Sequence, residues 1–290
     1  MPWQFTDDIE TYAGHTEGLL AARPAENTVA LTVLAAVRAG RRWSDEAMVF
    51  GWYVQEGHVG SADAVGGVSG AMSLTPPYEL LLAVVPAHCT GELVDGLRAR
   101  GTPVSGVNGE EGVASRFGAL WTQGTALVVT PVMRTRLYAL GHLRPPVPPP
   151  PGVARPAGRD DLELAVRWIA AFQLEAGTHA FDVREVMAEW ITADLLWCWE
   201  DLRGSVVSLA GRNPTAAGVA RVGPVFTPPE HRRRGFGAAV TAACTAAALE
   251  QDAQQVVLFT DQANPASNSI YQQIGFRPLS DRSVVRFDRQ

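Results

Sequence analysis

The sequence contains no lysine, so its 24 basic residues are all arginines, a bias that fits codon usage better than mechanism. Against 30 acidic residues they leave a formal net charge of -6 and an isoelectric point near 5.5. A general nucleic-acid binder needs a clustered positive surface for its phosphate contacts. The composition therefore argues against a nucleic-acid partner and leaves room only for a local basic site.

Cysteine and long apolar runs are also scarce. Cys89, Cys198 and Cys244 are odd in number and far apart, which fits neither a disulfide framework nor a metal-ligand cluster. We therefore expect no metal and a reducing, cytoplasmic location. The first ten residues are acidic and lack the apolar core of a secretory signal. No apolar stretch approaches the roughly 20 residues of a membrane span, so we expect no membrane association.

The length of 290 residues exceeds a typical domain of roughly 100 to 200 residues, and 47% of the residues are hydrophobic. Consecutive prolines in residues 145–151 favour an extended, semi-rigid backbone. We interpret this segment as a linker, with one domain over residues 1–144, the linker at 145–152 and a second domain over 153–290. A surface loop inside a single domain is the alternative.

The second domain alternates between helical and strand patterns. Apolar residues recur at helical spacing over 160–174, whereas 256–260 is a continuous apolar run typical of a buried strand. The predicted helices cover residues 160–174, 183–192, 238–251 and 267–274, and the predicted strands cover 195–200, 205–211, 218–227 and 256–260, before a final strand. This order predicts an α/β fold.

The first half is less clear. The patterns predict helices over residues 26–39, 91–100 and 110–120, and strands over 48–55, 79–85 and 126–132, with a polar, glycine-rich stretch before the last helix. Within the first half, the order strand, helix, loop, helix, strand is a reduced version of the element order in the second half. We find no repeat at the level of residues, so a duplication is inferred from the element order alone.

A short basic motif, Arg232-Arg233-Arg234-Gly235-Phe236-Gly237, lies between a predicted strand and a predicted helix. The first amides of a helix lack internal partners and the helix dipole adds partial positive charge, so this turn is suited to an anion. The glycines let the backbone approach a diphosphate, and arginines add charge-assisted contacts. A solvated charge run before an ordinary helix is the alternative interpretation of the motif alone.

This motif resembles the signature of the GNAT superfamily of N-acetyltransferases, Arg/Gln-x-x-Gly-x-Gly/Ala between a strand and a helix. Arg232, Gly235 and Gly237 match it. Farther on, residues 264–276 resemble the family's second conserved segment, in which an asparagine is followed by a tyrosine and Gly-Phe. Two motifs in the family's order are far more specific than either alone. The resemblance covers roughly residues 153–290.

The resemblance implies a mixed central sheet flanked by helices, with two such domains in tandem and a degenerate first one. It also implies acetyl-coenzyme A as the cofactor. The residues that it assigns to the cofactor are Val225, Phe226, Thr227, Arg232, Arg233, Arg234, Gly235, Phe236, Gly237, Ala238 and Asn268. The backbone of 225–227 would pair with the pantetheine and the acetyl carbonyl, and that of 233–238 with the pyrophosphate. Asn268 has a second interpretation as a cap of the local backbone.

Catalysis of amine acetylation needs a base for the amine and an acid for the leaving thiolate. Tyr271 matches the family's general acid, and a packed aromatic side chain is the alternative. The strand 218–227 contains no acid, so the base is open among Glu175, Asp261, Glu230, His231 and a water chain. We assign Asp261, at the end of a buried strand, although a structural cap there is equally consistent.

These assignments predict transfer of acetyl to a primary amine of a small-molecule or peptide acceptor, by direct attack in a ternary complex. The region after the first buried strand of the first half, residues 86–90, has no arginine and no paired glycines. We therefore expect the first domain to shape the acceptor site instead of binding cofactor. The rival function is a non-catalytic acyl-CoA sensor. The sequence fixes neither the acceptor nor the oligomeric state.

Overall fold

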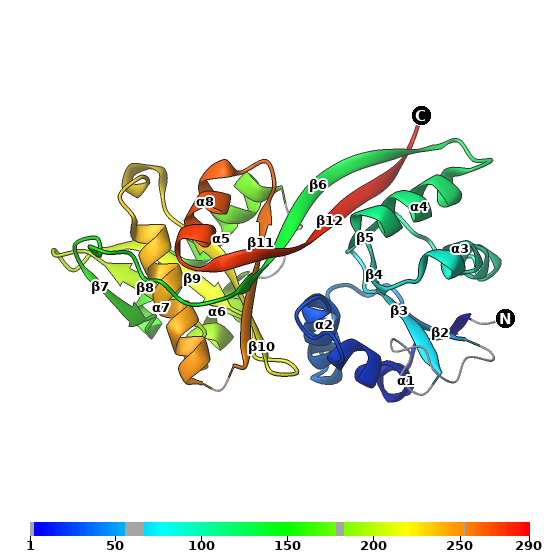
Figure 1. The fold of residues 1–290 in the computed structure, drawn as a ribbon, viewed down its shortest axis with the longest axis horizontal. Coiled ribbons are helices and arrows are strands. Elements are labelled where there is room, and N and C mark those ends of the chain that lie inside the picture. Colours follow the sequence, from blue (N-terminus) through cyan, green and yellow to red (C-terminus); the bar gives the residue numbers. More distant parts are fainter. Residues whose placement is uncertain (1–2, 56–66, 178–182, 252) are drawn as a thin grey trace. The chain divides into compact units, whose positions relative to one another are not determined.

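The computed structural model describes residues 3–55, 67–177, 183–251 and 253–290, and these form two compact units (Figure 1). The first unit comprises residues 1–137, 261–263 and 280–290, and the second comprises 138–260 and 264–279. Within the described residues, no helix is both long and apolar enough to cross a membrane.

The elements of the first half follow one another in a regular order. They are β1 (Trp3–Thr6), α1 (Ile9–Ala21), α2 (Thr28–Arg38), β2 (Val49–Val54), β3 (Val68–Leu74), β4 (Leu80–Val84), α3 (Thr90–Ala99), β5 (Gly106–Glu110), α4 (Glu111–Thr122) and β6 (Leu127–Leu140). A short 3-10 turn at Ala87–Cys89 leads from β4 into α3.

The second half repeats this order element by element. It contains β7 (Val153–Pro156), α5 (Leu162–Ala176), α6 (Val183–Thr192), β8 (Leu196–Glu200), β9 (Val206–Arg212), β10 (Val219–Phe226), α7 (Phe236–Glu250), β11 (Gln255–Asp261), α8 (Pro265–Gln273) and β12 (Phe276–Arg289). A 3-10 turn at Pro229–His231 leads from β10 toward α7. The duplication that the sequence showed only in reduced form is therefore present in the order of the described elements.

Each repeat donates part of its last strand to the other unit. The order of strands is β1-β2-β3-β4-β5-β12 in the first unit and β7-β8-β9-β10-β11-β6 in the second. Strand β12 pairs antiparallel with β5 from Arg282 opposite Glu110 to Arg286 opposite Gly106. Residues 138–140 of β6 belong to the second unit. Neither repeat therefore completes its own sheet from its own residues.

The core of the second unit lies on both faces of its sheet. Helix α7 contributes Phe236 and Ala239 to one hydrophobic cluster, and α5 and α6 contribute Ile169 and Met187 to the other. Alanine-rich α7 brings its backbone close to the strands because its buried side chains are small. These two helix layers define the two sides from which the end of β10 can be approached.

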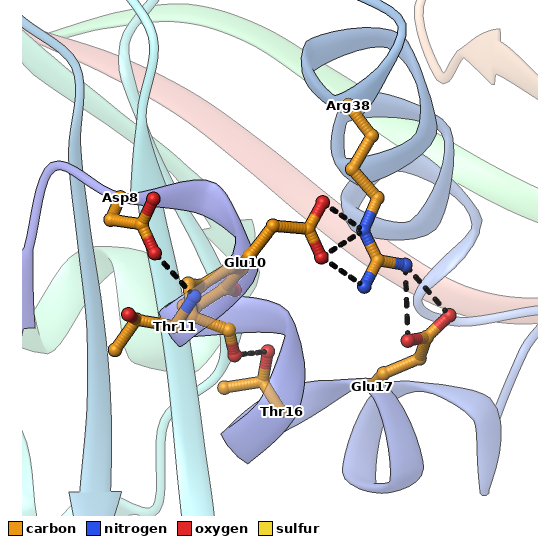
Figure 2. A network of polar contacts seen from close by, with 7 residues as sticks. Asp8, Glu10, Thr11, Thr16, Glu17 and Arg38 are labelled. Atoms are coloured by element: carbon orange, nitrogen blue, oxygen red, sulfur yellow. Dashed lines mark hydrogen bonds and ion pairs between the residues drawn. The ribbon is translucent and has the colours of Figure 1, made fainter.

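In the first unit a polar network joins α1 to α2. Asp8 caps α1 by accepting a hydrogen bond from the backbone N–H of Thr11 at 2.7 Å. Arg38 of α2 bridges Glu10 and Glu17 of α1 at 2.9 and 3.1 Å, as Figure 2 shows. Because these side chains are largely exposed, each bridge contributes about 1 kcal/mol or less and mainly fixes how the helices pair.

The boundaries of the compact units differ from those expected from the sequence. Residues 145–152 lie within the second unit, because β6 has already entered it at Tyr138. The backbone N–H of Gly141 donates to Gly275 O at 3.0 Å, and Trp199 Nε1 donates to Pro151 O at 3.2 Å. The proline-rich segment is thus hydrogen-bonded within the second unit.

Candidate functional site

Strands β10 and β11 run parallel for only part of their length. Their pairing extends from Val219 opposite Gln255 to Val222 opposite Leu258, whereas β10 continues to Phe226 and β11 to Asp261. On its other side β10 stays paired with β9, after a shift of register between Val222 and Val225. The two strands therefore diverge, and the backbone of the diverging ends, residues 223–226 and 259–261, is left without its parallel ladder.

The turn that leads into α7 presents backbone amides. Arg233 and Gly235 both have positive φ, at 61° and 84°, and Gly235 caps the helix. The N–H of Ala239 donates to Gly235 O at 3.1 Å. In the described part of the chain, the amides of 236–238 precede this hydrogen bond and have no helical partner. With the helix dipole they form a site for an anion.

Gly237 lies against the end of β10. A Cβ atom there would come within 3.3 Å of Thr227 Oγ1, which is itself hydrogen-bonded to Ser208 Oγ at 2.7 Å. The absence of a side chain at Gly237 lets the helix start close to the strand. Two exposed arginines, Arg233 and Arg234, flank this start. The guanidinium of Arg234 lies 4.8 Å from the centre of the Phe236 ring.

Arg232 has a different environment from the other two arginines. Its Nε donates to Thr227 O at 2.8 Å, and its Nη2 donates to both carboxylate oxygens of Glu175 at 2.9 and 2.8 Å. Its guanidinium carbon lies 5.9 Å from the centre of the Phe226 ring. The side chain therefore ties α5 to β10 and to the turn. It also holds Glu175, one of the candidate bases, in an ion pair.

Tyr271 of α8 is buried in the second unit. It is 9% exposed, belongs to the same hydrophobic cluster as Val222 and Phe236, and packs edge-on against Phe276 with 6.4 Å between ring centres. Burial raises the pKa of Tyr271 to about 12, partly offset by a hydrogen bond with Ser267. The phenol is therefore protonated at physiological pH and can act as a hydrogen-bond donor.

Asn268 is engaged by the protein itself. Its Nδ2 donates to Asn264 O at 2.7 Å, and its Oδ1 accepts from the hydroxyl of Tyr138 at 2.8 Å. Tyr138 is fully buried and also accepts from Gln272 Nε2 at 3.2 Å. Sequence reasoning missed Tyr138, because the strand was predicted only as far as residue 132. The continuous apolar run at residues 137–140 is the sequence signal that could have extended the strand.

The candidate bases occupy different environments. Asp261 Oδ1 accepts a hydrogen bond from the N–H of Ala263 at 2.9 Å, so the side chain caps the turn after β11. Glu230 is exposed. Within the described residues, His231 Nδ1 is buried without a hydrogen-bond partner. These contacts leave the assignment of Asp261 as a prediction.

The sequence and the fold both relate the chain to known proteins. Residues 203–285 match the family model described as "FR47-like protein", which spans both the diverging strands and α8. The chain has the GNAT fold. No curated protein sequence matches it significantly.

Several solved structures share this fold over most of the chain. A Drosophila protein has a TM-score of 0.66 at 12% identity and covers 99% of each chain. A GCN5-related N-acetyltransferase from Sphaerobacter thermophilus has a TM-score of 0.58 at 15% identity, covering 87% of this chain and 84% of its own. A tandem GNAT protein from the clavulanic acid biosynthesis pathway has a TM-score of 0.53 at 15% identity, covering 99% and 98%. At these identities the likeness concerns the fold, and it confirms the predicted α/β class with its mixed sheet.

The corresponding place in the first GNAT repeat is built differently. Its parallel pair, β4 and β5, stays in register from Leu80 opposite Val107 to Leu82 opposite Gly109, close to the ends of both strands. The turn into α3 contains no glycine, and Cys89 O accepts a hydrogen bond from Trp3 Nε1 at 3.0 Å. The first repeat thus lacks both the diverging strand ends and the glycine turn among its described residues.

Four large aromatic side chains of the second unit belong to its hydrophobic clusters or pack against them. Trp199 is buried under α7, and Trp168 packs on Phe226 with 6.0 Å between ring centres. Trp197 and Phe172 are partly buried against the same clusters. These positions agree with core packing.

Proposed function

We propose that the chain is an acetyl-CoA-dependent N-acetyltransferase that transfers acetyl to a primary amine by direct attack in a ternary complex. One observation carries the proposal. The parallel pair β10–β11 separates after Val222 and Leu258 in the same unit in which the amides of residues 236–238 are left without helical partners. A separated strand pair can accept an extended chain, and free helix amides can accept a diphosphate. Acetyl-CoA has both parts.

The residues around the start of α7 and the end of β10 fit acetyl-CoA. In the proposed complex the amides of residues 236–238 and the exposed side chains of Arg233 and Arg234 hold the diphosphate. The backbone of Val225 to Thr227 pairs with the pantetheine arm, and Asn268, which the protein already orients, borders it. Arg232 supports this backbone through its contact with Thr227 O. When bound, acetyl-CoA supplies the electrophilic thioester carbon.

The protein's own groups then serve the transfer. The amine nitrogen attacks the thioester carbon, the C–S bond breaks, and the amine loses one proton while the thiolate gains one. A backbone N–H of residues 225–227 stabilises the oxyanion. Tyr271 would donate a hydrogen bond to the leaving sulfur; because its pKa of about 12 exceeds that of a thiol, the phenol keeps its proton and the thiolate takes up a proton from water. Asp261 is the proposed acceptor of the amine proton.

Tyr271→Phe is expected to lower kcat by about 10² while the KM for acetyl-CoA changes little, because the phenol acts on the leaving group. Steady-state kinetics of thiol release against a primary-amine panel measure this. Phe276→Leu, which perturbs the packing of the same ring, is the matched control for a structural effect. A wild-type rate in Tyr271→Phe would remove the tyrosine from the mechanism, and binding of acetyl-CoA without turnover on any amine would favour the sensor.

The pKa of Tyr271 also gives a pH prediction. Its folded value of about 12 lies above the ordinary value of 10.0, so the stability tied to its proton is present below pH 10 and is lost as the pH rises from 10 to 12. Urea unfolding at pH 9, 10 and 11 should show a steeper loss of stability for wild type than for Tyr271→Phe. Parallel curves would contradict the burial of the phenol.

Each chain should bind a single acetyl-CoA, because the described residues of the first repeat offer neither diverging strands nor a glycine turn. Isothermal titration calorimetry of the full chain measures this stoichiometry. Two equivalent sites would contradict the assignment of the cofactor to the second repeat alone.

The remaining features of the proposal come from composition. The acceptor is a small molecule or a peptide, and no nucleic acid or membrane is a partner, in keeping with the net charge of -6. We propose the cytoplasm as the location because the three cysteines are free and buried.

A further inference from the structure

Gln173 of α5 carries a buried donor without a partner. The residue is 8% exposed, and its Nε2 has no hydrogen-bond partner in the part of the chain that the structure describes. Native proteins pair nearly all of their buried amide donors, because an unpaired one is destabilising. The Nε2 of Gln173 is therefore available to donate a hydrogen bond to water or to a bound molecule.

The position of Gln173 follows from contacts on both sides of it. Ala165, Ile169 and Gln173 are the buried residues of α5 and follow one another at intervals of four, so they form one stripe that faces the sheet. Earlier on the helix, the Trp168 ring packs on Phe226. Nearer the C-terminus of α5, Glu175 binds Arg232, which donates a hydrogen bond to the backbone oxygen of Thr227 at the end of β10. Along α5, Gln173 lies between these two contacts, and on this basis we place it near the end of β10.

The end of β10 has two different sides. Thr227 Oγ1 faces Gly237 of α7, where the free amides of the helix would hold the diphosphate. Phe226 belongs to the cluster on the side of α5 and α6. Since the donor substrate would take the α7 side, the amine has to reach the thioester from the α5 side. A buried, uncharged donor on that side is placed to contact the amine's own polar groups.

We propose that Gln173 is a specificity-determining residue that donates a hydrogen bond from Nε2 to a carbonyl oxygen of the acceptor, next to its amino-bearing carbon. This inference rests on the proposed function. The acceptor class is thus an amino-acid amide or a peptide amino terminus. A neutral amide donor suits a neutral carbonyl, and a site built to pair such an oxygen rejects analogues that lack it.

The test compares glycinamide with propylamine, which has a similar size and no carbonyl, in the full-length protein. Wild type should favour glycinamide, and Gln173→Met should reduce the ratio of the two kcat/KM values by about tenfold or more. The melting temperature of Gln173→Met without substrates should rise, because an unpaired buried donor has been removed. Leu174→Met, at an 85% exposed position of the same helix, is the control and should change neither quantity.

Two results would overturn the role of Gln173. One is an unchanged ratio in Gln173→Met, and the other is a lower melting temperature, which would show that Nε2 has a structural partner. Calorimetric titration with acetyl-CoA separates this inference from the function on which it rests. If wild type fails to bind acetyl-CoA, the proposed function fails; if it binds and acetylates both amines with the same ratio in wild type and variant, only the role of Gln173 fails.

Discussion

Gly237→Glu is expected to abolish binding of acetyl-CoA while leaving the protein folded. Gly237 is the second residue of α7, and a side chain there would start 3.3 Å from Thr227 Oγ1. A carboxylate at this position would take the place of the diphosphate and repel it. Two unit charges about 4 Å apart near a protein surface interact by about 4 kcal/mol, which corresponds to about a thousandfold in affinity.

The same substitution should not unfold the chain, because a negative side chain in the first turn of a helix is favourable. Calorimetry gives the affinity and circular dichroism gives the melting temperature. Ala246→Glu, on the same helix but about two and a half turns farther along, is the control for added charge and should bind acetyl-CoA like wild type. Unchanged affinity in Gly237→Glu would remove the diphosphate from the start of α7.

Removing β6 is expected to prevent folding of the second repeat. A chain limited to residues 145–290 contains both GNAT motifs but lacks Tyr138, whose side chain is fully buried among those of the second unit. It also leaves residues 280–289 of β12 without β5, their antiparallel partner. Two incomplete sheet edges then expose backbone groups and apolar side chains that the full chain covers.

The truncated chain should therefore show no cooperative thermal transition and should bind dyes that report exposed apolar surface. A single substitution, milder than the truncation, tests the contribution of Tyr138 to the second unit. Tyr138→Phe removes the hydroxyl that donates to Asn268 Oδ1, and its expected cost is about 1 to 3 kcal/mol in urea unfolding. A stable, cooperative fragment of residues 145–290 would contradict the exchange of strands between the repeats.

Local patterns predicted much of the fold of the second repeat. Helix α6 has the predicted bounds, and α5, α7, β8, β9, β10 and β11 differ from the predictions by at most two residues at either end. Amphipathic spacing and apolar runs determine these elements directly. In the first half, α1 was missed because Gly14 and Gly18 weaken its helical pattern, and β5 was missed because Gly106 and Gly109 do not look like strand residues.

The exchange of β6 and β12 could not be predicted, since it depends on pairing between residues far apart in the chain. Arg282 lies opposite Glu110, and nothing in either local sequence specifies that partner. The division of the compact units therefore differs from boundaries drawn at the proline-rich segment.

The candidate site was predictable in its backbone and less so in its side chains. A glycine turn before a helix is a local feature, so the positive φ of Gly235 and the free amides after it agree with the motif. The contact of Arg232 with Glu175 and the buried amide of Gln173 arise from the packing of α5 against β10, which sequence spacing does not give. The same holds for the contact between Tyr138 and Asn268.

The most direct test of the account is the release of free thiol from acetyl-CoA by the full-length protein, with and without a panel of primary amines. The account predicts thiol release that depends on an amine, matches the acetylated amine mole for mole, and is lost in Gly237→Glu. Equal release with and without amine, or binding of acetyl-CoA with no transfer to any amine, would contradict it.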